Sequence, residues 1–452
     1  MERESQQNPD VIRPEPATSR LEMTATEVGS VFVSNYPPYS QWSEEDLAAF
    51  DAVVHTAPGS EAAPLGMYLH IPFCRKRCRF CYFRVYTDKN ADEVQTYCAA
   101  LAREVDAYAA LPVTQGRPLR FIYFGGGTPS YIAGKHLAEL VRRIRQAFPW
   151  DEVEEVTFEC EPGTLTRPKL ENIHDLGITR LSLGVEHFND HILQLNGRAH
   201  ISTEIDRVIP WIHEIGFDQF NLDLIAGMIG DTWETWRDTV DKAIDANPDS
   251  VTTYQLELPF NTRISKEFMD GTLDIPLADW AQKREWNQYA IERLSEAGYV
   301  VSSAYTMVRG DSSFRYRDSL WRGADMLGTG VSSFGHIGGV HAQNTANWTE
   351  YLAAVAADRL PVNRALATTP HDRLIREFIL QMKTGEIDAG YFHRKFDVDV
   401  LEHFAVPLGE LAEQGMVALR ADGFDLTSTG LLQVDSLLPA FYDAEYQNAR
   451  YT

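Results

Sequence analysis

The sequence predicts an α/β protein built on a partial, TIM-like (β/α)6 barrel, with an N-terminal arm and a small C-terminal helical domain of winged-helix-like pattern. From residue 67 onward, short apolar runs alternate with longer amphipathic stretches. This order is typical of parallel strands joined by right-handed helical crossovers. After about residue 355 the alternation ends. The chain has 452 residues, of which 44% are hydrophobic, so it can form two or three packed regions.

The first part of the chain divides into a tail and an arm. We expect residues 1–30 to be disordered, because they are largely polar and interrupted by three prolines. Residues 31–66 form the predicted N-terminal arm, and the stretch 31–42 is rich in aromatic side chains. An aromatic stretch is unusual in a solvated tail, so we expect it to pack on the body of the protein.

The barrel core is predicted over residues 67–354. Its strands are short apolar runs, at residues 67–71, 121–124, 155–159, 180–185, 221–225 and 251–256. The clearest helix covers residues 93–110, with its apolar side chains on one face. Residues 231–234 read as a variant capping box that opens another helix. In such a barrel, functional residues are expected at the C-terminal ends of the strands.

Residues 355–452 form the predicted C-terminal domain. We expect helices near 374–382 and 408–414, a hairpin over 416–427 and a final apolar helix over 430–441. Winged-helix units often bind DNA, but residues 385–399 are not basic. We therefore expect a lid over the mouth of the barrel.

Composition narrows the class of protein further. The formal net charge of -24 would repel nucleic acid and an anionic membrane surface, so we expect neither as a partner. The sequence shows no apolar run of roughly 18–20 residues and no apolar signal core near Met1, which predicts a cytoplasmic protein. Three of the five cysteines lie between residues 74 and 81, which suits a metal or cluster site in a reducing compartment better than disulfides.

Cys74, Cys78 and Cys81 follow the first predicted strand with the spacing Cys-x3-Cys-x2-Cys. Three thiolates can ligate three irons of a [4Fe-4S] cluster and leave the fourth iron open. An open iron can bind S-adenosyl-L-methionine (SAM), which one electron then cleaves to a 5'-deoxyadenosyl radical. The alternative is a zinc site with Cys98 or Cys160 as fourth ligand, but structural zinc sites usually combine two separated pairs of ligands.

A glycine run follows the second predicted strand, in residues 123–130 (YFGGGTPS). Glycines let the backbone approach a ligand closely, and Pro129 fixes the exit of the chain. Such a run can also be a simple tight turn. Its place directly after the strand that follows the cysteine triplet favours a role in ligand binding.

These motifs resemble those of the oxygen-independent coproporphyrinogen III oxidase-like family of radical SAM proteins, which includes relatives similar to haem chaperones and to radical methyltransferases or cyclopropanases. The likeness extends over nearly the whole chain after residue 36. The matching runs are 68–74 (YLHIPFC), 125–129 (GGGTP), 158–163 (FECEPG), 180–188 (RLSLGVEHF), 196–198 (NGR), 221–227 (NLDLIAG), 325–334 (DMLGTGVSSF) and 342–344 (AQN).

The resemblance implies a radical SAM barrel that binds two SAM molecules, one on the cluster and one beside it. Tyr68, Gly126 and Glu159 match contacts to one molecule, and Phe80, Gly127, Thr128, Arg198 and Asp223 match contacts to the other. The chemistry is consistent, because carboxylates accept hydrogen bonds from ribose hydroxyls and a guanidinium pairs with a methionine carboxylate. The resemblance also implies a tetrapyrrole or another small conjugated substrate, and a flavodoxin- or ferredoxin-type electron donor.

Two positions depart from the family pattern. Glu186 stands where the family usually has glutamine, which adds a negative charge near the positive sulfonium of the cofactor. Phe83 stands where the porphyrinogen oxidases have a fourth cysteine. We therefore rank methyl or methylene transfer from the second SAM slightly above oxidative decarboxylation of coproporphyrinogen III, and a non-catalytic haem chaperone remains an alternative.

Two histidines have open roles. His70 lies on the strand before the cluster and either tunes its potential or is a satisfied core residue. His341 is a weaker candidate, which could face the substrate.

Overall fold

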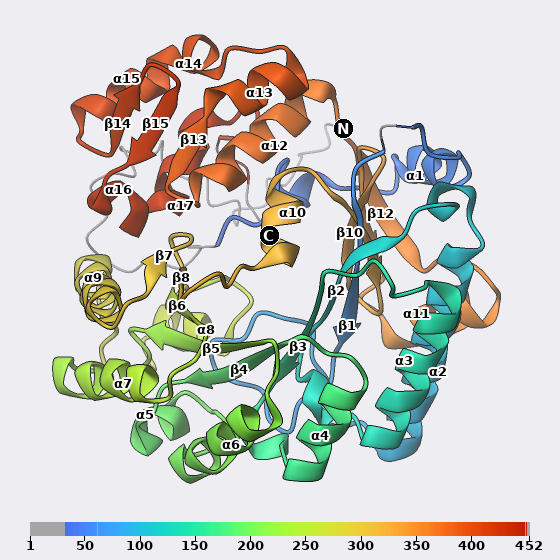
Figure 1. The fold of residues 1–452 in the computed structure, drawn as a ribbon, viewed down its shortest axis with the longest axis horizontal. Coiled ribbons are helices and arrows are strands. Elements are labelled where there is room, and N and C mark those ends of the chain that lie inside the picture. The colour runs from blue at the N-terminus through green and yellow to red at the C-terminus, as the bar shows by residue number, and fades with distance from the viewer. Residues whose placement is uncertain (1–31, 61, 448, 450–452) are drawn as a thin grey trace, which may run out of the picture.

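The structure is a computed structural model and describes residues 32–60, 62–447 and 449. The predicted disordered tail, residues 1–30, lies outside the described residues. A 12-stranded sheet forms the centre of the molecule, in the order β12-β11-β10-β9-β1-β2-β3-β4-β5-β6-β8-β7, and Figure 1 shows how it bends around the interior. The edge strands β12 and β7 do not pair with each other, so the barrel is open.

Six neighbouring strands of this sheet are parallel and match the six predicted ones. They are β1 (Leu65–Ile71), β2 (Leu119–Gly126), β3 (Glu155–Cys160), β4 (Arg180–Glu186), β5 (Gln219–Ala226) and β6 (Ser250–Gln255). Each pairs with the next in parallel register. The predicted α/β class with a parallel core is therefore confirmed.

The sheet continues beyond the parallel core on both sides. On the β1 side, β9 pairs in parallel with β1, and β10, β11 and β12 follow as an antiparallel meander. On the β6 side, β8 pairs with β6 in antiparallel register, and β7 pairs with β8 in the same way. The bounds of these strands are Val300–Val301 (β7), Thr306–Val308 (β8), Asp325–Thr329 (β9), Phe334–Ile337 (β10), Val340–Asn344 (β11) and Val362–Ala367 (β12).

Helices cover the outer face of the sheet (Figure 1). They include α1 (Leu47–Val54), α2 (Ala91–Ala109), α3 (Gly134–Ala147), α4 (Arg167–Asp175), α5 (Asp190–Leu195), α6 (Ser202–Ile215), α7 (Trp233–Asp245), α9 (Trp280–Glu296) and α11 (Trp348–Ala356). The helix predicted near residue 231 is α7, but its capping residue is Thr232, whose hydroxyl accepts the Thr235 N–H. None of the helices in the described residues has both the length and the apolar character needed to span a lipid bilayer.

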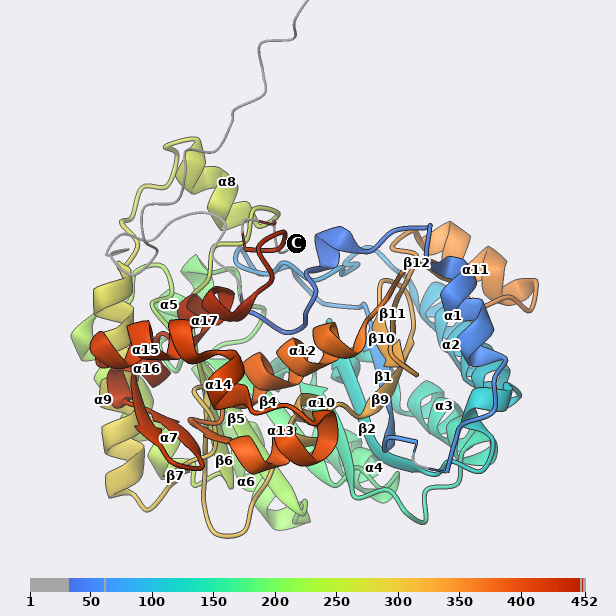
Figure 2. The same ribbon diagram turned by 90° about the horizontal axis from the view of Figure 1, so that it is seen from above.

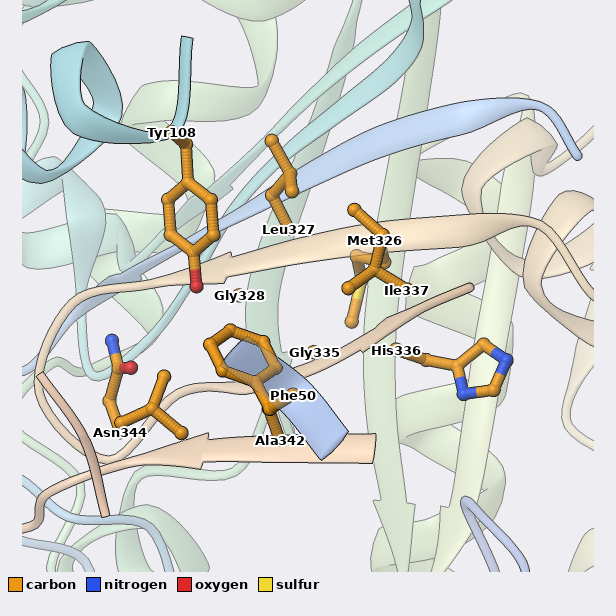
Figure 3. A pocket seen from close by; sticks show the side chains of 11 residues that line it. Phe50, Tyr108, Met326, Leu327, Gly328, Gly335, His336, Ile337, Ala342 and Asn344 are labelled. Atoms are coloured by element: carbon orange, nitrogen blue, oxygen red, sulfur yellow. The ribbon is translucent and has the colours of Figure 1, made fainter. Parts of the chain in front are cut away.

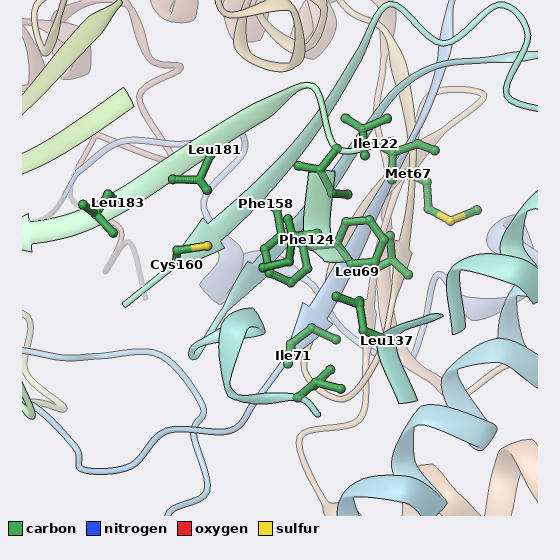
Figure 4. Packing of buried hydrophobic residues seen from close by; sticks show 14 of the residues in the cluster. Met67, Leu69, Ile71, Ile122, Phe124, Leu137, Phe158, Cys160, Leu181 and Leu183 are labelled. Carbon is green, nitrogen blue, oxygen red and sulfur yellow. The ribbon is translucent and has the colours of Figure 1, made fainter. Parts of the chain in front are cut away.

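Side chains of the parallel strands alternate between the helices and the interior. Figure 4 shows the helix-facing set, in which Met67, Leu69 and Ile71 of β1 pack beside Phe124 and Phe158. The intervening residues face the interior of the barrel. This two-residue period directs the polar members of each strand, such as a glutamate on β3 and an aspartate on β5, into one space.

The inner face of the barrel is partly filled by α10 (Arg315–Trp321). Its start is fixed by the buried carboxylate of Glu155, which accepts hydrogen bonds from the backbone N–H of Arg315 (2.9 Å) and Tyr316 (3.2 Å). A carboxylate at the first turn of a helix satisfies N–H groups that lack partners within the helix. The cap places the Tyr316 ring 4.4 Å from the ring of Tyr123 on β2.

The C-terminal region has its own hydrophobic cluster. A three-stranded sheet, in the order β13-β15-β14, packs with short helices beside the barrel (Figure 2). The elements are α12 (Pro370–Met382), β13 (Glu386–Asp388), α13 (Ala389–Phe396), α14 (Val400–His403), α15 (Ala405–Glu413), β14 (Val417–Arg420) and β15 (Gly423–Leu426). The hairpin predicted over residues 416–427 is confirmed as β14 and β15. A third strand, β13, which was not predicted, pairs with β15.

The final helix predicted over residues 430–441 is wrong as a single element. The chain forms α16 (Ser428–Leu432), α17 (Val434–Leu437) and a 3-10 turn at Leu438–Phe441 instead. Gln433 leaves the helical region, with φ of -130°. Pro439 has no N–H to continue a helical ladder, and the break lets apolar side chains from each piece enter the same cluster.

The N-terminal arm packs on the body of the protein, as its aromatic residues predicted. Tyr36 is fully buried within the C-terminal cluster, and Val33 joins the same cluster. Trp42 instead stacks on His341 of β11, with ring centroids 4.9 Å apart. The arm therefore contacts both the barrel sheet and the C-terminal region.

We expect Phe378→Ala to lower the free energy of unfolding by about 3–5 kcal/mol, because a buried phenylalanine leaves a cavity when truncated. Its ring lies at the centre of the C-terminal cluster, 4.5 Å from Phe404 and 5.0 Å from Phe441. Urea unfolding followed by fluorescence measures the change. Leu419→Ala, at a position 53% exposed, is the control and should stay within about 0.5 kcal/mol. Equal losses in the two variants would contradict this account of the cluster.

Candidate active site

Polar side chains from the C-terminal halves of β1, β2, β3 and β5 meet inside the barrel. Glu159 on β3 is the centre of the first group. Its carboxylate accepts hydrogen bonds from the Tyr123 hydroxyl (2.7 Å) and from the Gly126 backbone N–H (3.1 Å). The ring of Tyr68 stacks on that of Tyr123, with centroids 5.9 Å apart. Tyr68, Gly126 and Glu159, which were assigned to one SAM molecule, therefore lie together.

The glycine run at the end of β2 is pressed against the end of β1. The Gly127 N–H donates to the Ile71 carbonyl (2.9 Å), and a Cβ on Gly127 would lie 2.7 Å from that same oxygen. Gly126 has φ of +107°, which disfavours residues with a side chain. The close approach requires glycine, so the run is more than an ordinary tight turn.

The next residue, Thr128, connects this run to the cysteine loop. Its hydroxyl donates to the Cys74 sulfur at 3.3 Å. The loop is also fixed by backbone bonds, from the Arg79 N–H to the Asn196 carbonyl (3.0 Å) and from the Cys81 N–H to the Cys78 carbonyl (3.3 Å). The three sulfur-bearing residues are all partly exposed.

A second group forms around Arg198, which precedes α6. Its guanidinium donates to the Gly184 carbonyl (2.6 Å) and to the Cys78 sulfur (3.5 Å), and lies 3.5 Å from the Glu186 carboxylate. Glu186 itself has φ of +64°, at a bulge in the pairing of β4 with β5. This unusual backbone turns the end of β4 so that its acid meets the arginine.

Asp223 on β5 is held by a separate polar network. Its two carboxylate oxygens accept from the Ser182 hydroxyl (2.8 Å) and the Asn221 amide (2.9 Å). Burial raises the pKa of Asp223, and it also raises the pKa values of Glu159 and Glu186 to about 7, with the nearby charge of Asp223 adding to both. Three acids thus share a space in which Arg198 is one compensating charge.

One supporting network was not predicted. Glu161 accepts from the Arg75 guanidinium (2.9 and 3.2 Å) and lies 3.1 Å from Nδ1 of His200. His200 in turn contacts the Val185 carbonyl through Nε2 at 3.1 Å. The network joins the cysteine loop to the ends of β3 and β4. The other members lie 86 to 125 positions from Arg75 along the chain, and only Glu161 and Val185, within the runs 158–163 and 180–188, carried any signal in the sequence.

Three further predicted residues have clear places. Phe80 packs against the apolar cluster that contains Ile229 and Ile264, and its contact to a cofactor stays a prediction. His70 contacts the Tyr68 hydroxyl (3.2 Å) and the Arg84 carbonyl (3.1 Å), and burial lowers its pKa to about 4, so it is a neutral link between β1 and the cysteine loop. His341 is fully buried against the arm, where it cannot face a substrate.

The thiol set fits an iron–sulfur cluster. Within the described part of the chain, no three potential ligands are close enough to bind a single metal ion. In a cubane each thiolate binds a different iron, so three ligands stand around the cluster rather than around one atom. Cys98 and Cys160, the fourth ligands of the zinc alternative, are both buried in the main hydrophobic cluster. The donor set and the hydroxyl beside Cys74 therefore suit a cluster with one iron left open.

Comparison with known proteins agrees with this site. Family models match at residues 68–243 (radical SAM superfamily) and 368–432 (HemN C-terminal domain). The haem chaperone HemW of Synechocystis sp. is 30% identical over 62% of this chain and 68% of its own length. The chain belongs to the radical SAM superfamily, within its coproporphyrinogen III oxidase-like family. Membership implies a [4Fe-4S] cluster and SAM.

Similarity to the porphyrinogen oxidases of this radical SAM family extends over more of the chain. The oxygen-independent coproporphyrinogen III oxidases of Synechocystis sp. and Escherichia coli are each 27% identical over 92% of this chain and over 92% and 93% of their own lengths. The solved structure of the Escherichia coli enzyme HemN superposes with a TM-score of 0.79, at 26% identity, covering 91% of this chain and 96% of that one. The predicted fold class is confirmed.

The small pocket in Figure 3 lies apart from this site. It is enclosed by α1, α2 and the strands β9 to β12, and none of the predicted site residues line it. Its walls include Phe50, Tyr108 and Leu327 and are mostly apolar. It is a gap in the packing behind the sheet.

We expect Cys78→Ala to abolish assembly of the cluster, because only two thiolates of the triplet remain. Anaerobic reconstitution followed by iron analysis and visible absorption measures the loss. Cys98→Ala is the matched control, since Cys98 is buried on α2 and should leave the iron content unchanged. An intact cluster in the Cys78 variant would refute the assignment of the ligands.

We expect Glu186→Gln to weaken the pH dependence of SAM binding between about pH 6 and 8. The carboxyl of Glu186 loses its proton as the pH rises through about 7, and the negative charge then attracts the sulfonium. Wild-type affinity should rise about threefold to tenfold over this range, and the variant should rise less, with Glu159 supplying the remainder. Equilibrium binding to the unreduced, reconstituted protein measures it. Identical slopes in the two proteins would contradict the role of Glu186.

Proposed function

We propose that this radical SAM protein is an enzyme that oxidatively decarboxylates the propionate side chains of a coproporphyrinogen-type tetrapyrrole. The observation that carries the proposal is the combination of the cysteine loop and the acid-lined interior with similarity to porphyrinogen oxidases over nine-tenths of both chains. The sequence alone ranked methyl or methylene transfer slightly higher, and the comparisons favour decarboxylation instead.

The cluster and SAM, when bound, supply a 5'-deoxyadenosyl radical that can abstract hydrogen from an unactivated carbon. Cys74, Cys78 and Cys81 would hold the irons, and the Thr128 hydroxyl, which donates to the Cys74 sulfur, would tune the potential of the bound cluster. A low-potential, one-electron donor of the flavodoxin or ferredoxin type supplies that electron.

The chain's own residues divide into two cofactor-binding groups. Glu159, with Tyr68 and the Gly126 backbone, offers hydrogen-bond acceptors and donors for one SAM molecule. Arg198 and Asp223, from β4–α6 and β5, offer a cation for a carboxylate and an acceptor for ribose hydroxyls of a second. Phe80, Gly127 and Thr128 complete that second group by position. Two SAM molecules are thus part of the proposal.

Within this site, the aromatic side chains Tyr68, Tyr123 and Tyr316 form a wall beside Glu159. Such a wall limits the access of solvent and of small molecules that could react with an intermediate. Loss of a hydrogen atom from the β-carbon of a propionate, followed by loss of carbon dioxide and one electron, gives a vinyl group. The abstracted hydrogen atom ends in 5'-deoxyadenosine, and the released electron passes to a one-electron acceptor, which the reaction requires as a separate oxidant.

Methyl or methylene transfer is a second candidate, supported by one specific residue. Phe83 stands at the position of the fourth cysteine of the oxidases, is 43% exposed, and stacks on Tyr82 with ring centroids 4.5 Å apart. An aromatic pair at this point offers a surface for a flat, conjugated substrate. In this reaction, the second SAM would donate its carbon to an sp2 atom.

Reduced, reconstituted protein incubated with methyl-deuterated SAM and coproporphyrinogen III should release 5'-deoxyadenosine without deuterium, together with carbon dioxide, because hydrogen comes from the propionate. Mass spectrometry of both products measures this. Deuterium in the 5'-deoxyadenosine would instead establish activation of the methyl group. Stoichiometric, tight binding of haem without turnover would establish a chaperone, and the Cys78→Ala protein is the control for background cleavage.

A further inference from the structure

The loop that carries the cysteines has a charge opposite to that of the protein. Residues 74–87 contain five basic side chains and no acidic one, whereas the whole chain has a formal net charge of -24. Such a local excess of positive charge on an acidic protein creates a confined field that an acidic partner would recognise. The five side chains are Arg75, Lys76, Arg77, Arg79 and Arg84.

Two of these five side chains hold the loop in place. Arg75 bonds Glu161, as described above, and Arg79 forms an ion pair with Glu267 of α8 (Arg263–Met269). The α8 backbone is also attached to the loop, because the Ile264 N–H donates to the Arg79 carbonyl at 3.0 Å. The charges of Arg75 and Arg79 are therefore paired within the protein.

The other three side chains face outward. Lys76, Arg77 and Arg84 belong to exposed residues, and no salt bridge joins them to an acid among the residues that the structure describes. The Arg77 guanidinium donates to the Cys81 carbonyl at 3.2 Å, and Arg84 lies over the ring of Tyr86 at 5.2 Å. Their charges are therefore available to a partner, and the loop is already fixed without using them in ion pairs.

The position of these charges matters as much as their sign. Lys76 and Arg77 lie between the ligands Cys74 and Cys78, which are themselves partly exposed. A donor bound at this surface would therefore lie within a few residues of two of the cluster ligands. Exposed Lys266 lies on α8, the helix attached to the loop, and extends the basic region.

We propose that Lys76, Arg77 and Arg84 form the docking surface for an acidic, one-electron donor protein that reduces the cluster. The inference rests on the proposed function only in requiring a reducible cluster. One electron leaves the donor and is gained by the cluster, and no atom is transferred. Because the protein as a whole carries a formal net charge of -24, its overall field repels an acidic donor, and the positive charge of this loop supplies a local attraction that sets the donor's orientation.

The decisive experiment compares Lys76→Glu/Arg84→Glu with a control of equal charge, Arg207→Glu/Arg359→Glu, whose exposed residues lie on α6 and after α11. Reconstituted proteins are mixed anaerobically with reduced flavodoxin, and loss of the visible absorption of the oxidised cluster is followed by stopped flow. At low salt, the loop variant should be reduced about tenfold or more slowly, and the control within about twofold of wild type. Added salt should slow wild type and bring its rate toward that of the variant.

Reduction by dithionite, a small reagent that needs no docking, separates this proposal from the proposed function. All three proteins should be reduced equally by it. If the charge reversal lowers iron content, Lys76→Gln/Arg84→Gln takes its place, with the same direction expected. Equal flavodoxin rates in the loop variant and the control would overturn the docking surface. Failure of the dithionite-reduced wild type to cleave SAM would overturn the proposed function alone.

Discussion

The close approach of the glycine run to the end of β1 is the constraint on which the site depends. Gly127 can bond the Ile71 carbonyl only because it has no side chain. That contact brings the Thr128 hydroxyl to the Cys74 sulfur and leaves the Gly126 N–H free to reach Glu159. A side chain at position 127 would therefore push the cysteine loop away from the group around Glu159.

Much of this arrangement could be predicted from the sequence, because it depends on local patterns of apolar and polar residues. The six parallel strands follow from apolar runs, and their two-residue period already directs Glu159 and Asp223 inward. The contacts that stabilise the interior are different in kind. Glu155 caps α10 from 160 residues away, and Arg75 bonds Glu161 across 86 residues. No spacing rule connects such pairs, since their meeting depends on the completed barrel.

The break in the final helix at Gln433 could not be predicted from the sequence either, because packing of the C-terminal cluster overrides an apolar pattern that favours one helix.

Buried acids dominate the electrostatics of the barrel interior. Glu159, Glu186 and Asp223 are costly to ionise together in a buried space, which is why burial raises the pKa of each. Arg198 offsets part of this cost while it also bonds the Cys78 sulfur. A cationic sulfonium entering the same space supplies a further positive charge. Under the proposed function, these acids favour a cationic cofactor such as SAM over a neutral or anionic nucleoside of similar shape, and glutamate at position 186 would strengthen that preference.

The two faces of the cysteine loop differ in charge and in proposed function. Its inner face contacts Arg198 and Thr128 and meets a space lined by acids, which suits a cationic cofactor. Its outer face exposes Lys76, Arg77 and Arg84, which suits an acidic donor. Arg75 and Arg79 lie between these faces and hold the loop by ion pairs to Glu161 and Glu267. Because those pairs fix the loop independently of either ligand, the proposed donor could deliver an electron from one side without displacing the groups proposed to bind the cofactor on the other.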